Sequence, residues 1–156
     1  MGLDLFLYKH TKDNMTLEEE LDTGLAYGRK TWSIAEFFRR RCKCLDWDWY
    51  YEVTKADWDE FIDSLEKLNE PEFRERVEKF INRYENIETD EDKADEEFWK
   101  EYNTIEEWYS GAVNNDAGYT LGFDWELRAV LRWFDANEEV QQAFKDGVDV
   151  RLIVSY

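Results

Sequence analysis

The sequence predicts a single α+β domain, and three observations lead to this prediction. Its 156 residues suit one domain with a hydrophobic core. Apolar residues alternate with a period of two in three segments, whereas four or five segments between them repeat apolar residues at helical spacing. No repeat or linker divides the chain, so residues 1–156 are expected to form one small, mainly antiparallel sheet packed by amphipathic helices.

Three strands are expected, near residues 2–8, 46–53 and 148–156. In each of them alternate side chains share one face and are expected to be buried. These apolar positions are Leu3, Leu5 and Leu7; Leu45, Trp47, Trp49, Tyr51 and Val53; and Val148, Val150, Leu152, Val154 and Tyr156.

Local signals predict where the helices begin and end. Capping pairs three residues apart and a proline suited to a first helical turn indicate helix starts. These signals are Thr16 with Glu19, Ser33 with Glu36, Thr54 with Asp57, Pro71, Asp124 and Asn137. Gly111 and Gly147 are expected just past helix ends, and residues 85–97 and 111–123 are expected to be loops.

The apolar stripes of these helices predict the side of each helix that faces the core. They are Ile34, Phe37, Phe38 and Leu45; Trp58, Phe61, Ile62, Leu65 and Leu68; Phe73, Val77, Phe80, Ile81 and Tyr84; Phe98, Tyr102, Ile105 and Tyr109; Leu127, Val130, Leu131 and Phe134; and Val140 with Phe144.

The charge balance excludes some partners. With 38 acids and 20 bases, the formal net charge is −18 at pH 7, which argues against direct nucleic-acid binding and against docking on anionic membranes.

The start of the chain shows no secretory signal, and the two cysteines, Cys42 and Cys44, lie too close together in sequence to link distant elements by a disulfide. A cytoplasmic setting is therefore expected.

Residue chemistry points away from catalysis. His10 is the only histidine, no nucleophile motif is present, and Cys42 and Cys44 lack the spacing of a zinc site. We therefore expect no catalytic residue, no metal and no cofactor.

The acids are concentrated in one part of the chain. Residues 85–107 hold 11 acids and two bases, whereas residues 29–43 hold six bases and one acid. Gathered on one face, these carboxylates would be steered toward basic surfaces that normally bind phosphates. The predicted partner-binding face comprises Glu85, Glu88, Asp90, Glu91, Asp92, Asp95, Glu96, Glu97, Glu101, Glu106 and Glu107.

Several segments resemble a family of small proteins found in tailed bacteriophages and prophages. The opening Met1-Gly2-Leu3-Asp4 matches the start of that family, and residues 26–30 match its AYWRK-type motif, with Gly28 where an aromatic residue is usual. The resemblance extends through the aromatic segment that follows and implies a phage origin, in the cytoplasm of the host cell. It implies no particular activity.

Three functional hypotheses follow. In the first, the chain is a non-enzymatic, phage-encoded DNA mimic, whose acidic face occupies the basic surface of a host nucleic-acid-binding or defence protein. In the second, Tyr27, Arg29 and Lys30 bind an anionic small molecule at the start of the helix near Ser33, in a binding protein or an enzyme. In the third, the tryptophans form the interface of a homodimer or an assembly.

Overall fold

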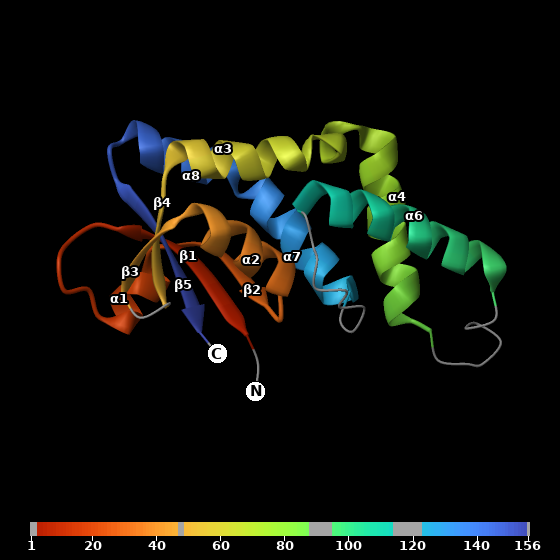
Figure 1. The fold of residues 1–156 in the computed structure, drawn as a ribbon, viewed down its shortest axis with the longest axis horizontal. Coiled ribbons are helices and arrows are strands. Elements are labelled where there is room, and N and C mark those ends of the chain that lie inside the picture. The colour runs from red at the N-terminus through yellow and green to blue at the C-terminus, as the bar shows by residue number, and fades with distance from the viewer. Residues whose placement is uncertain (1–2, 47–48, 88–94, 114–122, 156) are drawn as a thin grey trace.

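The fold is α+β, as predicted, and is built on a five-stranded antiparallel sheet (Figure 1). The computed structural model describes residues 3–46, 49–87, 95–113 and 123–155. The strand order is β2-β1-β5-β4-β3, so the first and last strands of the chain lie side by side in the middle. The strands are β1 (Asp4–His10), β2 (Gly24–Arg29), β3 (Lys43–Asp46), β4 (Tyr50–Val53) and β5 (Asp149–Ser155).

One face of the sheet is apolar, as the alternation predicts. Leu5 lies opposite Val154, and Leu152 lies between Leu7 on β1 and Tyr51 on β4. All five side chains are at most 3% exposed. The pattern is confirmed at the two ends of the chain because both strands are central and covered by helices.

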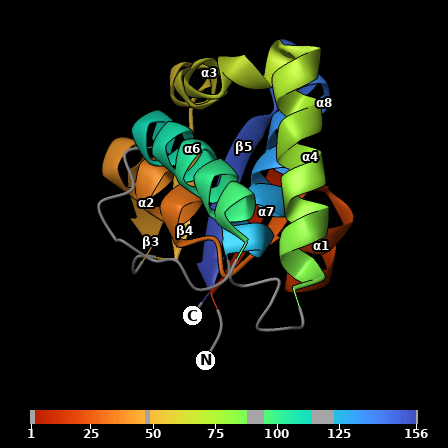
Figure 2. The ribbon, with the colours of Figure 1, turned by 90° about the vertical axis from the view of Figure 1, so that its right-hand side faces the viewer.

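The helices form two layers over this apolar face (Figures 1 and 2). On this face three helices contact the sheet: α2 (Trp32–Arg41), α7 (Phe123–Asp135) and α8 (Asn137–Lys145). Packed against these helices are α3 (Lys55–Ser64), the short 3₁₀ helix η1 (Glu66–Asn69), α4 (Pro71–Glu85) and α6 (Glu96–Val113). None of the helices in the described ranges combines the length and apolar character needed to cross a bilayer.

The remaining helix, α1 (Leu17–Asp22), lies on the opposite face of the sheet, where Glu20 receives a hydrogen bond from Tyr50.

The core between the sheet and the helical layers is aromatic. Its centre is made by rings from α2, α3 and α7 whose centroids lie 5.0–6.4 Å apart. These rings belong to Phe37, Phe38, Trp58, Phe61 and Trp133.

The strand predicted over residues 46–53 is confirmed as one strand only at Tyr50–Val53, while Trp47 and Asp48 lie outside the described residues. The chain instead forms a β-hairpin, in which β3 and β4 pair antiparallel and the amide of Trp49 donates to the carbonyl of Asp46 at 2.9 Å. Leu45 and Trp49 are therefore exposed, whereas Tyr51 and Val53 are buried as expected. Leu45 is also absent from the helix assigned to it, since α2 ends at Arg41.

Several expected boundaries also differ. Ser33 lies inside α2 rather than before it, α6 continues through Gly111 to Val113, and Asp124 falls within α7. Asn137 begins α8 but does not cap it, because its amide oxygen accepts from Trp58 Nε1 at 2.8 Å. Strand β2 was not expected. Residues 88–94 of the predicted loop 85–97, residues 114–122 of the predicted loop 111–123, and Tyr156 lie outside the described residues.

Candidate anion-binding site

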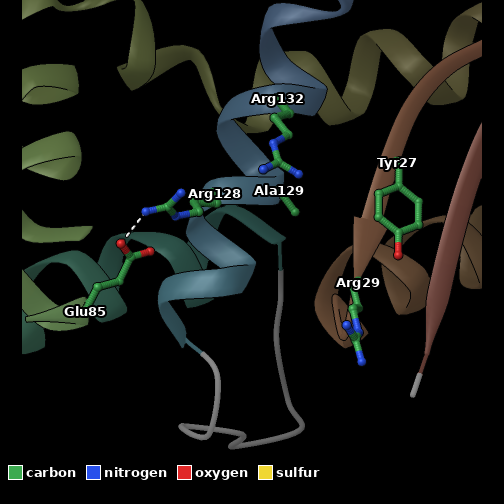
Figure 3. A pocket seen from close by; sticks show the side chains of 6 residues that line it. All are labelled: Tyr27, Arg29, Glu85, Arg128, Ala129 and Arg132. Carbon is green, nitrogen blue, oxygen red and sulfur yellow. Dashed lines mark hydrogen bonds and ion pairs between the residues drawn. The ribbon is translucent and has the colours of Figure 1, made fainter. Parts of the chain in front are cut away.

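Three arginines from two elements line a surface pocket of about 370 Å³, and Arg128 is turned toward Glu85 (Figure 3). Tyr27 and Arg29 extend from the edge strand β2, and Arg128 and Arg132 extend from α7 on the other side. We call this the arginine pocket; it is lined by Tyr27, Arg29, Glu85, Arg128, Ala129 and Arg132.

Strand and helix periodicity place these side chains together. Tyr27 and Arg29 are two residues apart on a strand, so they share one side of it, while Gly28 between them is buried on the other. Arg128 and Arg132 are four residues apart on α7 and therefore lie on one helix face. Both arginines are exposed, opposite the apolar stripe of the helix.

Gly28 allows β2 to approach the helices closely. A Cβ at this position would lie 2.8 Å from Thr31 Oγ1 and 3.4 Å from Trp133 Nε1, and both neighbours are fully buried. This close packing holds β2, which carries Arg29, next to α7, which carries Arg132.

Tyr27 has a defined orientation in the pocket wall. Its hydroxyl donates to Asp4 Oδ1 at 2.9 Å, and its ring lies 4.9 Å from that of Phe6. Burial and the Asp4 carboxylate raise the pKa of Tyr27, while the charges of Arg29 and Arg132 act to lower it. Both guanidinium groups are therefore close enough to the phenol to act on it electrostatically.

The charges of the pocket favour an anion. Among the described residues, Glu85 at the end of α4 is the one carboxylate that lines the pocket, and it forms an ion pair with Arg128. Arg132 has no ion pair with the described residues. Guanidinium groups bind carboxylate and phosphate oxygens through paired hydrogen bonds, so this arrangement suits an oxyanion.

The residues of the second hypothesis lie in different places. Tyr27 and Arg29 line the pocket, but Lys30 does not, and its amide donates to the carbonyl of Leu3 at 2.6 Å. Two backbone amides at the start of α2 are also hydrogen-bonded: those of Trp32 and Ser33 donate to the carboxyl group of Glu126. These two amides at the start of α2 therefore already have an acceptor within the chain.

Sequence patterns missed Arg128, Arg132 and Glu85 as parts of this pocket. Long-range pairing of β2 with β1 and packing of α7 on β2 create the pocket, and neither is visible in local periodicity. One signal was available, because two arginines four residues apart are unusual in a chain whose acids outnumber its bases almost twofold.

The predicted acidic face is partly neutralised. Besides Glu85, Asp95 pairs with Arg83, and Glu101 forms two hydrogen bonds of 3.0 Å with Arg76. Four members lie on α6 without an ion pair among the described residues: Glu96, Glu97, Glu106 and Glu107. The other four, Glu88, Asp90, Glu91 and Asp92, lie outside those residues.

The cysteines are free thiols in different environments. Cys42 is buried and donates to Asp57 Oδ2 at 3.5 Å, and burial together with this carboxylate raises its pKa; Cys44 is exposed. Across the described ranges, no three His, Cys, Asp or Glu side chains are grouped as metal ligands.

Comparisons with protein-family models, with curated proteins and with solved structures find no match to this chain.

Proposed function

We propose that this protein binds a small molecule carrying a phosphate group in the arginine pocket. One observation carries the proposal: Arg29, Arg128 and Arg132 line one pocket of a chain whose net charge is −18. The volume of about 370 Å³ is within the range of small-molecule sites. Glu85 holds Arg128 in the absence of ligand, and an incoming phosphate would compete with it for this guanidinium.

Calorimetric titration with inorganic phosphate at constant ionic strength tests this proposal. The wild type is expected to bind saturably, and Arg132→Gln to reduce the affinity at least tenfold because a charge-assisted contact is lost. Lys145→Gln on α8 is the matched control, since it changes the net charge equally at an exposed position away from the pocket. Equal weakening by the two substitutions would show a nonspecific charge effect and contradict the proposal.

A second candidate function uses the acidic side of α6. Glu96, Glu97 and Glu107 are exposed and have no ion pair among the described residues, which supports a surface that attracts a basic protein. In this proposal the chain is phage-encoded, as the motif resemblance implies, and acts in the host cytoplasm by covering the nucleic-acid-binding surface of a defence protein. It requires no catalysis by this chain.

Binding to a basic nuclease over a series of salt concentrations tests the second candidate. Charge mimicry predicts that affinity falls steeply with salt and that replacing Glu96, Glu97 and Glu107 with Gln weakens binding. The control triple variant replaces exposed acids elsewhere, namely Glu18, Glu138 and Glu139. Salt-independent affinity, or equal effects of the two triple variants, would contradict mimicry by this face.

A further inference from the structure

A second pocket lies on the face of the sheet opposite the helical layers. Its volume is about 310 Å³, and it shares no lining residue with the arginine pocket. Strands β1, β4 and β5 supply its floor, while α1 and the end of β3 supply its walls. We call it the polar pocket, after its polar lining residues Tyr8, His10, Glu20, Asp46, Tyr50 and Arg151.

Glu20 is the unusual member of this group. Its side chain belongs to α1 and is 7% exposed, yet it has no ion pair with a described residue, and its one hydrogen bond with such a residue comes from Tyr50 at 3.5 Å. Burial raises the pKa of Glu20 above its usual value. A buried carboxylate with so little compensation is costly for folding. A ligand that donates hydrogen bonds to it would remove much of this cost.

The pocket has a negative and a positive end. At the negative end, Tyr50 lies close enough to Glu20 and Asp46 for both carboxylates to raise its pKa. At the positive end, Arg151 contacts the hydroxyl of Tyr8. The negative charges are carried by α1 and β3 and the positive charge by β5, and Arg151 lies close enough to Glu20 for its charge to act on that carboxylate.

Two buried atoms near the positive end lack partners. Arg151 Nε and His10 Nδ1 have no hydrogen bond with any described residue. Buried polar atoms of this kind usually have a partner, which at a pocket wall is often water or a ligand. An anionic ligand group would bring hydrogen-bond acceptors to this end.

We propose that the polar pocket binds a small zwitterion, the class to which free amino acids belong. The ammonium group lies against Glu20 and Asp46, and the carboxylate faces Arg151. Met15 and Leu45 also line the pocket and give the ligand side chain an apolar surface. A purely anionic ligand would face two carboxylates, and a purely cationic one would face Arg151, so neither matches both ends.

Three matched probes test this proposal: L-leucine, L-leucinamide, which lacks the carboxylate, and N-acetyl-L-leucine, which lacks the ammonium group. Calorimetric titration of the wild type is expected to show saturable binding of L-leucine. The other two probes are expected to bind at least tenfold more weakly. No binding of L-leucine up to its solubility limit, or equal binding of all three probes, would overturn the proposal.

Variants locate the site and separate it from the arginine pocket. Glu20→Gln and Arg151→Gln are each expected to weaken L-leucine binding at least tenfold, whereas Glu18→Gln, an exposed position on the same helix, leaves it unchanged. Arg132→Gln is also expected to leave it unchanged. Because the probe comparison uses only the wild type, it tests the proposal even if a variant misfolds. Equal affinity of Glu20→Gln and wild type would refute this location.

Discussion

At the scale of single residues, Glu126 replaces a local helix cap with one from a distant part of the chain. Its buried carboxyl group accepts hydrogen bonds from Ser33 Oγ and from the first amides of α2, and it also contacts the hydroxyl of Tyr109. Ser33 Oγ and the Tyr109 hydroxyl are themselves 2.6 Å apart. The group therefore ties α2, α6 and α7 together.

The pKa of Glu126 predicts a pH dependence of stability. Burial raises this pKa despite the hydrogen bonds, so the folded state holds the proton more strongly than the unfolded chain does. The resulting stabilisation is complete below the ordinary carboxyl pKa of 4.5 and is lost as the pH rises through the raised value. Glu126→Gln cannot titrate at this site.

Urea unfolding between about pH 4 and pH 8 measures this effect. The free energy of unfolding of the wild type is expected to fall relative to that of Glu126→Gln as the pH rises. Parallel pH profiles for the two proteins would contradict a raised pKa at this site.

Two glycines give opposite predictions for the same substitution. Gly28→Ala places a Cβ 2.8 Å from buried Thr31, so we expect a loss of about 1–3 kcal/mol from overpacking. Gly111→Ala on α6 meets no atom within 4 Å and is expected to add about 0.5–1 kcal/mol through helix propensity. Denaturant unfolding of both variants checks the signs, and an unchanged stability for Gly28→Ala would refute the close packing of β2.

At the scale of elements, local sequence signals predicted the start of a helix correctly where a hydrogen bond between neighbouring residues caps that helix. The capping boxes at Thr16 and Thr54 form as expected, and Pro71 begins α4. The box at Ser33 fails because Ser33 lies inside α2, where both its amide and its Oγ donate to Glu126 of another helix. The hairpin over residues 43–53 was also not predicted, because apolar residues alternate without interruption through this segment and no turn signal marks its reversal.

The two capping boxes should differ in their consequences. Thr54→Ala removes the cap of α3, whose Trp58 and Phe61 are fully buried, so a loss of about 1 kcal/mol in global stability is expected. Thr16→Ala acts on the short, peripheral α1 and is expected to speed hydrogen exchange of the Glu20 and Thr23 amides with little global effect. A global loss from Thr16→Ala as large as that from Thr54→Ala would contradict this distinction.

The candidate site was predictable only in part, and the reason is geometric. A single strand supplies Tyr27 and Arg29, which one motif contains. Arg128 and Arg132 arrive there because α7 packs on the edge strand, a contact between segments about 100 residues apart. The polar pocket was missed for the same reason: His10, Glu20 and Arg151 belong to three separate elements.

At the scale of the whole molecule, the net charge of −18 sets the response to ions. Repulsion among excess carboxylates destabilises the compact state, so added sodium chloride should raise the thermal midpoint. Phosphate at constant ionic strength should raise the midpoint further by binding the native state, which adds about 1.4 kcal/mol to the free energy of unfolding at ten times the dissociation constant. Arg132→Gln should remove most of the phosphate increment and keep the chloride effect; loss of both would contradict a specific site.

The most direct test of the account is a residue-resolved NMR titration of the wild type with inorganic phosphate at constant ionic strength. Saturable shifts are expected for the backbone amides of Tyr27, Arg29, Arg128 and Arg132, with one common dissociation constant. Amides of α8 remote from the pocket should stay unchanged. Small, linear shifts spread over all exposed basic residues would contradict a phosphate site between β2 and α7.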